Sequence, residues 1–479
     1  MHQSSLLKNG SFINGQWLSS LEKFDVTNPF DNSAVASVSN AGVDETTKAV
    51  QAAKHALAAW SQMPANERAI LMRKWFDLVI KNQDELAKIL TLEQGKPLAE
   101  SKGEIVYGGS FIEWFSEEGK RVYGDTIQAL STDKRIVVIK QPVGVVAAIT
   151  PWNFPNAMIA RKAAAALAAG CTFVVRPASL TPLSALALAE LSKQAGIPDG
   201  VFNVVVGTDS RAMGEVLTTH PDVAKFTFTG STEVGKALIK QCASTVKKVS
   251  MELGGNAPFI VFDDADIDAA VQGAIASKYR NAGQTCVCTN RILVQETVLE
   301  VFTQKFVKAV QALIVGNGLD DNVYVGPMVS TAAVEDVEKL VAKSLNSGAK
   351  LLTGGRSEMG NCFYLPTVLA NVTNDMAIAA NEIFGPVAPI ISFKSEKEAI
   401  EIANDTEYGL SAYFYARDIG RVWRVSEALE FGMIGINEGL ISNAAAPFGG
   451  VKQSGGGREG SKYGLDDYLE IKYLCMGGI

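Results

Sequence analysis

The sequence predicts an α/β protein whose first large unit is a doubly wound parallel sheet. From Gly144 onward, short strands of nearly continuous apolar residues alternate with helices. Strands that are buried on both faces have this composition, and the repeated β-α-β order is typical of a parallel sheet. A length of 479 residues is too great for one simple core, so two or three domains are expected.

The chain ahead of this sheet is predicted to be mainly helical. Residues 12–40 read as short strands and turns. Between Asp44 and Ser116 the apolar residues recur at helical spacing, and the tripeptide Gly95-Lys96-Pro97 interrupts the pattern. We therefore expect a block of helices between the N-terminal strands and the sheet.

Residues 121–141 differ from both neighbouring regions and predict a small β-excursion with polar ends. No adjacent segment offers it a core, so we expect an oligomerisation segment that pairs with the edge of another chain. The predicted last strand, residues 468–474, is a second candidate partner within the same chain.

The strands of the parallel sheet are predicted at 145–149, 172–175, 202–206 and 225–228, with helices at 156–169, 182–194, 210–218 and 232–242. A second α/β unit follows, in which the run 266–281 reads as a helix. The expected domains are residues 1–120 with 142–253 for the first unit and residues 254–445 for the second. The segments 121–141 and 446–479 are expected to bridge the domains or to form the oligomer.

Composition and charge exclude several classes of protein. The net charge of −7 and the lack of any basic block argue against a nucleic-acid surface. No apolar run is long enough to span a bilayer, and Met1 to Gly10 lack the apolar core of a signal peptide. Because 6 cysteines are too few for a disulfide framework, we expect a cytoplasmic protein in a reducing compartment.

The three histidines, His2, His55 and His220, lie far apart in the sequence. A histidine-based metal site and a Ser-His-Asp triad are therefore not expected, and no metal is predicted. If the protein performs covalent chemistry, its general base must be another group, and a carboxylate is the obvious candidate.

Ligands of doubly wound sheets bind beyond the carboxyl ends of the strands, so residues at these ends are candidate site residues. Asn153 follows the strand 145–149 and offers an amide NH₂ to an oxyanion; alternatively, it caps the helix that begins near Pro155. Arg176 and Ser179 follow the next strand and suit a ribose or a phosphate; the alternative is a solvated loop charge.

Two further strand ends carry candidate residues. Gly230 lets the backbone approach a phosphate at the start of a helix, where Ser231 is either a ligand or a plain N-cap. Glu252 ends an apolar strand ahead of paired glycines, where desolvation would raise its pKa toward that of a general base. An ordinary exposed carboxylate is the other interpretation of Glu252.

Cys286 and Cys288 flank one valine directly after the predicted helix 266–281. Glycine and small polar residues around them predict a turn, in which a thiol is accessible and local dipoles favour its thiolate. The alternative is a pair of buried cysteines that act as small apolar side chains.

Five motifs occur in order along essentially the whole chain. They are Pro151-Trp152-Asn153-Phe154-Pro155, Met251-Glu252-Leu253-Gly254-Gly255, Gly283-Gln284-Thr285-Cys286, Asn381-Glu382-Ile383-Phe384-Gly385-Pro386 and Pro447-Phe448-Gly449-Gly450. Together they resemble the signatures of the aldehyde dehydrogenase superfamily. Arg161-Lys162, Tyr279-Arg280-Asn281, Cys286-Val287-Cys288 and Glu438 to Ser442 are similar to the branch that oxidises succinate semialdehyde.

The resemblance implies a doubly wound cofactor domain, a second α/β catalytic domain and a covalent mechanism. The Cys286 thiolate would attack the aldehyde, Asn153 and the Cys286 backbone N–H would hold the oxyanion, and Glu252 would activate water. Cofactor-binding residues are implied at Trp152, Asn153, Arg176, Pro177, Ala178, Ser179, Gly230, Ser231, Leu253, Glu382 and Phe384. Arg161, Arg280 and Ser442 would bind the distal carboxylate of the substrate.

Departures from the family pattern refine the expected cofactor and substrate. Arg176 stands where the family usually has Lys, and Ser179 where NAD-strict members often have Glu, so NADP is expected as the preferred cofactor, with NAD as the alternative. Small residues near Ser442 leave open glutarate semialdehyde or a broader range of short aldehydes.

The resemblance also bears on regulation and assembly. A Cys286–Cys288 disulfide would form a reversible redox switch, with packing of Cys288 as the alternative. We expect a homodimer or homotetramer acting on a small aldehyde, without nucleic-acid or membrane partners. A catalytically silent sensor or structural protein on the same scaffold is the interpretation from a different class.

Overall fold

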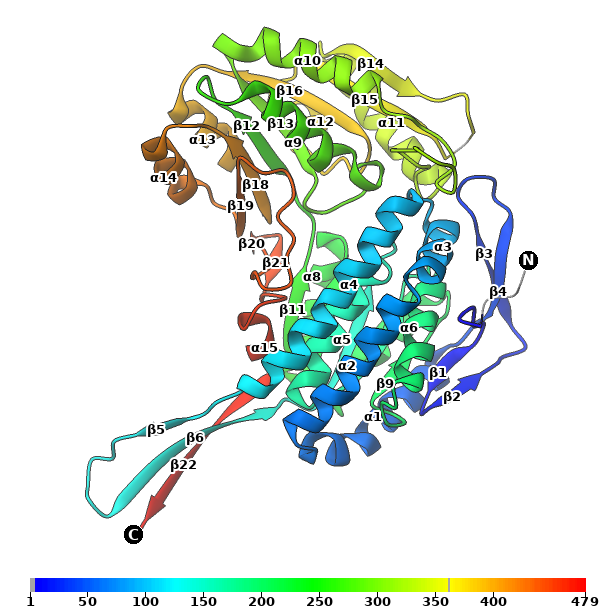
Figure 1. Ribbon diagram of the computed structural model, residues 1–479, viewed down its shortest axis with the longest axis vertical. Coiled ribbons are helices and arrows are strands. Elements are labelled where there is room, and N and C mark those ends of the chain that lie inside the picture. The colour runs from blue at the N-terminus through cyan, green and yellow to red at the C-terminus, as the bar shows by residue number, and fades with distance from the viewer. Residues whose placement is uncertain (1–4, 361) are drawn as a thin grey trace.

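The computed structural model describes residues 5–360 and 362–479, and it confirms the predicted α/β class. His2 lies outside the described residues. Two units, each built on a sheet flanked by helices, lie end to end in an elongated molecule, and a thin β-arm extends from the far end of the first unit (Figure 1). None of the described helices is both long and apolar enough to cross a membrane.

The first unit contains an 8-stranded sheet in the order β2-β1-β9-β8-β7-β10-β11-β21. Its parallel strands are β7 (Val145–Thr150), β8 (Thr172–Pro177), β9 (Phe202–Val204), β10 (Val223–Thr229) and β11 (Lys248–Glu252). Antiparallel strands complete both edges: β1 (Ser11–Ile13) with β2 (Gln16–Leu18), and β21 (Gly455–Gly456).

Helices cover both faces of this sheet, which confirms that it is doubly wound. Alternate residues of β7 point to opposite faces, so Val146 joins one apolar core and Val145 joins another. One face carries α2 (Ala65–Lys81), α3 (Gln83–Gln94), α4 (Leu98–Glu118), α5 (Ala157–Ala169) and α6 (Leu183–Gln194). The other carries α1 (Val43–Gln62), α7 (Ser210–Thr219) and α8 (Thr232–Cys242). A separate hairpin pairs β3 (Lys23–Thr27) with β4 (Ala34–Ser39).

The second unit contains a 7-stranded sheet in the order β14-β15-β16-β13-β12-β18-β19. Its strands are β12 (Ala257–Val261), β13 (Thr289–Gln295), β14 (Lys350–Arg356), β15 (Tyr364–Ala370), β16 (Val387–Phe393), β18 (Ser411–Tyr415) and β19 (Met433–Ile436). Its helices are α9 (Ile267–Tyr279), α10 (Leu299–Gln311), α11 (Thr331–Asn346), α12 (Ala377–Ala380), α13 (Glu396–Asn404) and α14 (Ile419–Ala428). A short pair, β17 (Tyr408–Gly409) with β20 (Val451–Lys452), joins this unit to the C-terminal tail.

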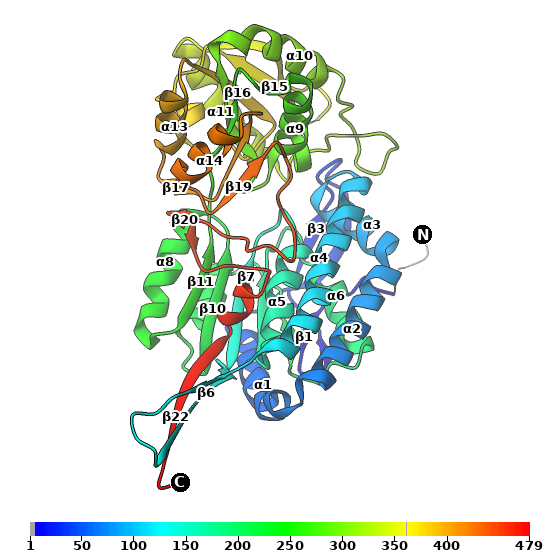
Figure 2. The same ribbon diagram turned by 60° about the vertical axis from the view of Figure 1, so that its left-hand side comes forward.

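The predicted β-excursion is a three-stranded arm that includes the end of the chain. The arm contains β5 (Asp125–Ile127), β6 (Lys134–Pro142) and β22 (Leu469–Gly477), in the order β22-β6-β5. β22 runs antiparallel to β6 from Leu469 opposite Pro142 to Gly477 opposite Lys134. Figure 2 shows both strands leaving the body of the molecule together. The predicted pairing of the tail with the excursion is therefore confirmed within one chain.

Candidate active site

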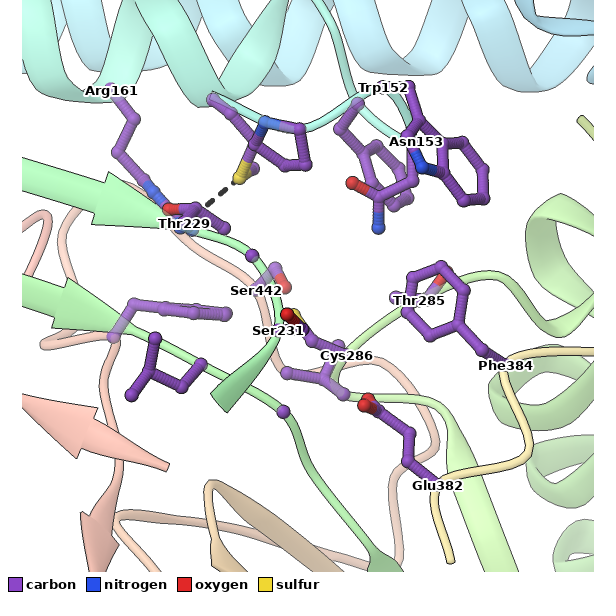
Figure 3. Close-up of a pocket in the computed structure, with 18 of the residues that line it drawn as sticks. Trp152, Asn153, Arg161, Thr229, Ser231, Thr285, Cys286, Glu382, Phe384 and Ser442 are labelled. Atoms are coloured by element: carbon purple, nitrogen blue, oxygen red, sulfur yellow. Dashed lines mark hydrogen bonds between the residues drawn. The ribbon is translucent and has the colours of Figure 1, made fainter. Parts of the chain in front are cut away.

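A cavity of about 260 Å³ lies between the two units. Both units contribute to its wall, as Figure 3 shows for ten labelled side chains. The lining residues are Tyr107, Pro151, Trp152, Asn153, Phe154, Met158, Arg161, Thr229, Gly230, Ser231, Leu253, Gly254, Arg280, Thr285, Cys286, Val287, Glu382, Phe384, Ser442 and Phe448.

The Cys286 loop is held in a conformation that local sequence does not favour. Helix α9 ends at Tyr279, two residues before the end predicted, because Asn281 and Ala282 adopt left-handed φ angles of 52° and 53°. Gly255 permits close packing of the loop, since a Cβ there would lie 2.4 Å from the Cys286 carbonyl oxygen. The result is a half-buried thiol that faces the cavity (Figure 3).

The thiol of Cys286 is neutral at rest. Burial raises its pKa to about 12, while the nearby Arg161 guanidinium offsets part of that increase. Nucleophilic attack requires the thiolate, so a base must remove the proton when substrate is bound.

Asn153 points toward Cys286 from the opposite wall of the cavity (Figure 3). Its Nδ2 donates to the Gln284 carbonyl at 3.0 Å, which leaves the second N–H of the amide for a ligand. Asn156, not Asn153, occupies the N-cap of α5, so the alternative role of Asn153 as a helix cap is wrong.

Glu252 is the last residue of β11 and is only 2% exposed. Burial raises its pKa to about 8, and the negative charge of Glu459 raises it further, whereas Arg161 and Lys162 lower it. Its Oε2 has no hydrogen-bond partner, and the residue stands behind the lining of the cavity rather than in it. Glu252 is therefore a buried carboxyl whose pKa lies near neutral pH, and it is not an exposed strand-end carboxylate.

The two arginines predicted to bind substrate differ in their partners. Arg161 is 1% exposed and forms an ion pair with Glu459, which also pairs with Lys162. Arg280 lies 5.4 Å from the centre of the Phe154 ring and makes no ion pair with any carboxylate in the described part of the chain. Arg280 thus offers the less compensated positive charge, with the half-buried Ser442 on the same cavity wall.

The side of the cavity nearest α8 suits a dinucleotide. Ser231 occupies the N-cap position of α8, yet its side chain makes no capping bond and remains available. Glu382 accepts the Gly255 N–H at 3.1 Å through one oxygen, and burial raises its pKa to about 7. The rings of Trp152 and Phe384 pack edge to face, with 5.5 Å between their centroids. Uncapped helix N–H groups, a free hydroxyl and a carboxylate fit a phosphate and a ribose.

The remaining predicted cofactor residues lie at the carboxyl end of β8. Arg176, Pro177, Ala178 and Ser179 follow one another there and do not line the described cavity. Arg176 is 7% exposed, and its Nη2 donates to the Gly207 carbonyl at 3.1 Å. This guanidinium therefore has a partner within the protein already.

The two neighbouring cysteines have different environments. Both are free thiols, but Cys288 is buried outside the cavity lining and its Sγ donates to the Lys278 carbonyl at 3.0 Å. The turn predicted around Cys286 thus exposes one thiol and packs the other.

Several cavity residues were not predicted from the sequence as site residues. They are Tyr107, Pro151, Phe154, Met158, Thr229, Gly254, Thr285, Val287 and Phe448. Phe154, Thr285 and Phe448 lie inside or beside motifs that were recognised. Tyr107 lies in the middle of α4, where helical spacing gives no signal of a site.

A cysteine facing an amide donor at the junction of a doubly wound sheet and a second α/β unit defines a thiol-dependent oxidoreductase of the dinucleotide-binding class. The sequence profile of the aldehyde dehydrogenase family matches residues 17–474, and the chain belongs to this family. The predicted resemblance and the predicted oxidation of aldehydes are thereby confirmed.

Relatives of the chain are named for different aldehyde substrates. The chain is 58% identical over 480 residues to the NADP⁺-dependent succinate-semialdehyde dehydrogenase of Escherichia coli, covering 100% of this chain and 99% of the relative. It is 57% identical to a glutarate-semialdehyde dehydrogenase of Pseudomonas aeruginosa, with 100% of both chains covered. It is 59% identical to a 3-sulfolactaldehyde dehydrogenase of Pseudomonas putida, covering 99% and 98% of the two chains.

Solved structures agree with the fold along the whole chain. A succinate-semialdehyde dehydrogenase from Burkholderia pseudomallei superposes with a TM-score of 0.98 at 58% identity, covering 100% of this chain and 99% of the other. An NADP-dependent enzyme from E. coli also gives 0.98 at 58% identity, with 99% of both chains covered.

Proposed function

We propose that the protein oxidises succinate semialdehyde to succinate, with NADP⁺ as the preferred cofactor. The observation that carries this proposal is the shared cavity of Cys286 and Arg280, in which a nucleophile and an unpaired cation line one space. A substrate with an aldehyde at one end and a carboxylate at the other matches both groups. The similarity to the NADP⁺-dependent succinate-semialdehyde dehydrogenase of E. coli supports the same substrate and cofactor.

Glu252 accepts the thiol proton of Cys286, and the thiolate sulfur then forms a bond to the aldehyde carbon. The carbonyl electron pair moves to oxygen, where the Asn153 amide and the Cys286 backbone N–H stabilise the negative charge. When the carbonyl re-forms, the C–H bond breaks and leaves a thioester on Cys286. Bound NADP⁺ supplies the acceptor for the two electrons and the hydrogen of that bond.

Hydrolysis of the thioester completes the cycle. Glu252 first releases the thiol proton to solvent and then takes a proton from water, while the hydroxide oxygen bonds to the acyl carbon and the C–S bond breaks to give the Cys286 thiolate. Glu252 returns this second proton to the thiolate, and the product acid loses its own proton to solvent. The sum is aldehyde, NADP⁺ and water giving carboxylate, NADPH and two protons. Burial of Glu252 serves both proton transfers, because a pKa of about 8 lies close to neutral pH.

The cofactor would be held by Trp152, Gly230, Ser231, Leu253, Glu382 and Phe384, with the segment 176–179 nearest its ribose phosphate. Ser179 supports NADP⁺, since a neutral hydroxyl does not repel a 2′-phosphate. Arg176 uses one N–H on the Gly207 carbonyl while its buried Nε has no partner, so it adds positive charge and keeps further donors for a phosphate. We further propose a cytoplasmic homodimer or homotetramer that assembles through the arm.

The test is a panel of aldehydes assayed by NADP⁺ or NAD⁺ reduction. We expect the highest kcat/KM for succinate semialdehyde with NADP⁺. A higher kcat/KM for NAD⁺ would contradict the cofactor assignment. A preference for glutarate semialdehyde would favour the second candidate function, which is oxidation of that five-carbon aldehyde. The P. aeruginosa relative and the exposed Asn443 beside Ser442 support this alternative.

A further inference from the structure

A buried lysine lies behind the Asn153 loop, although no step above uses it. Lys96 follows Gly95, whose left-handed φ of 95° ends α3, and its side chain is 1% exposed. Its Nζ donates to Glu104 Oε2 at 2.6 Å and to the Asn153 backbone carbonyl at 2.7 Å. The same Nζ lies 3.8 Å from the centre of the Phe154 ring. Two of these three contacts, with the Asn153 carbonyl and the Phe154 ring, lie on the segment that carries Asn153.

The turn that contains Lys96 also contacts the Cys286 loop. Asn281, one of the two left-handed residues of that loop, donates through Nδ2 to the Asn153 carbonyl at 3.0 Å. Gln94 donates to Asn281 Oδ1 at 2.9 Å and accepts the Lys96 N–H at 3.0 Å. The Asn153 carbonyl is thus fixed from two sides, by Lys96 and by the loop of the nucleophile.

Two carboxylates on α4, four residues apart, complete this support. Glu104 accepts the N–H groups of Asn156 and Ala157 at 2.9 and 3.2 Å, at the start of α5. Glu100 accepts the Asn281 N–H at 2.8 Å. One face of α4 therefore holds the oxyanion side of the cavity through Glu104 and the thiol side through Glu100.

We infer that Lys96 is a positioning residue, which fixes the Asn153 peptide so that the side-chain amide points at the oxyanion. The inference rests on the proposed function, because it requires Asn153 to stabilise that oxyanion. Donors in such sites act only when they are held in place before the reaction, and small misplacements cost large factors in rate. Lys96 should bear on kcat rather than on KM, since it does not line the cavity.

The experiment is a double-mutant cycle between Lys96→Met and Asn153→Ala, measured with succinate semialdehyde and NADP⁺. We expect Lys96→Met to lower kcat by about 100-fold, with both KM values changing less than about threefold. Since Lys96 acts through Asn153, the double variant should be no slower than Asn153→Ala alone. Independent, multiplying losses in the double variant would overturn the inference.

Lys247→Met is the matched control for the loss of a buried lysine. Lys247 is 9% exposed and its Nζ donates to the His220 and Val223 carbonyls at 2.5 and 2.7 Å, away from the cavity. It should lower the melting temperature but keep kcat. If Lys96→Met does not fold, Glu104→Gln replaces it in the cycle with the same expected non-additivity, and additive losses there also overturn the inference.

The cycle separates failure of the inference from failure of the proposed function. Wild-type kcat in Asn153→Ala would remove the oxyanion role and therefore the proposed mechanism. A slow Asn153→Ala together with full activity in folded Lys96→Met would leave the mechanism intact and refute only the role of Lys96.

Discussion

The two sheets present opposite ends of their strands to the cavity. The first sheet presents the carboxyl ends of its parallel strands, with Asn153 after β7, Ser231 after β10 and Glu252 at the end of β11. The second sheet presents amino ends, because Cys286 precedes β13 and Glu382 precedes β16. Figure 1 shows the second unit stacked beyond the strand ends of the first.

This difference determines what each unit can contribute electrostatically. At carboxyl ends the following helices begin, and their N-termini favour anions such as phosphate. At the amino ends of the second sheet α9 comes to its C-terminus, where carbonyl groups favour neutral or positive partners. Cys288 donates to one of those carbonyls, that of Lys278. The first unit is suited to bind the charged cofactor, and the second keeps its thiols neutral until a base acts.

Removal of the nucleophile gives the largest expected effect. Cys286→Ala should lower kcat by about 10⁴-fold or more, because no other cavity side chain supplies a thiolate. Residual rates can be read from NADPH formation in overnight assays. Substantial activity in this variant would mean that the second unit does not supply the covalent step.

Replacement of the base tests the contribution of the first unit. Because Glu252 serves both proton transfers, Glu252→Gln should slow the first burst of NADPH formation by about 100-fold or more. A burst at the wild-type rate followed by no turnover would mean that another group removes the thiol proton. In the wild type, kcat should rise as pH increases through about 8, since the buried carboxyl must lose its proton to act. Stopped-flow absorbance over pH 6–9 measures both, and a flat profile in the wild type would exclude Glu252.

Replacement of Arg280 or Arg161 should have smaller effects, and the two substitutions should differ from each other. Arg280→Ala should raise KM for succinate semialdehyde by about 10- to 100-fold, the value of one charge-assisted hydrogen bond, with little change for an uncharged aldehyde. Arg161→Ala should instead lower thermal stability, because Glu459 loses one of its two buried cations. Equal changes in KM for both aldehydes would rule out recognition of the carboxylate by Arg280.

The smallest effect concerns the second thiol. Cys288→Ala should keep its kcat within about twofold of wild type, since the Cys288 thiol lies outside the cavity lining and donates only to backbone carbonyls such as that of Lys278. If a Cys286–Cys288 disulfide forms under peroxide, the wild type should regain activity with thiol and the variant should not. Identical recovery in both proteins would show that Cys288 has no redox role.

The α/β character of both units was predictable, but the rule that locates site residues at strand ends works only for the first unit, for a physical reason. Apolar strands in a β-α-β order indicate a parallel sheet, and the carboxyl-end rule then leads to Asn153, Ser231 and Glu252. The same rule misses Cys286, which the turn predicted around it indicated before any family motif did, and it also misses Glu382.

Long-range side-chain contacts lay beyond prediction, unlike the strand pairing of the tail with the excursion. The ion pair of Arg161 with Glu459 joins segments far apart in the chain, and spacing carries no record of it. Lys96 read as part of a helix-breaking tripeptide, so its side-chain contact with Asn153 became visible only in three dimensions.

The C-terminal tail has a consequence for how the enzyme is made. Gly455 pairs with Glu252, Ser454 accepts the Leu253 N–H at 2.9 Å, and Glu459 compensates Arg161 and Lys162. During synthesis on the ribosome, all the cavity residues up to Phe448 emerge before these partners do. At that stage Glu252 lies on a strand, β11, that still lacks its edge partner β21. A product terminated ahead of Ser454 would therefore carry the nucleophile beside a base whose strand lacks its edge partner.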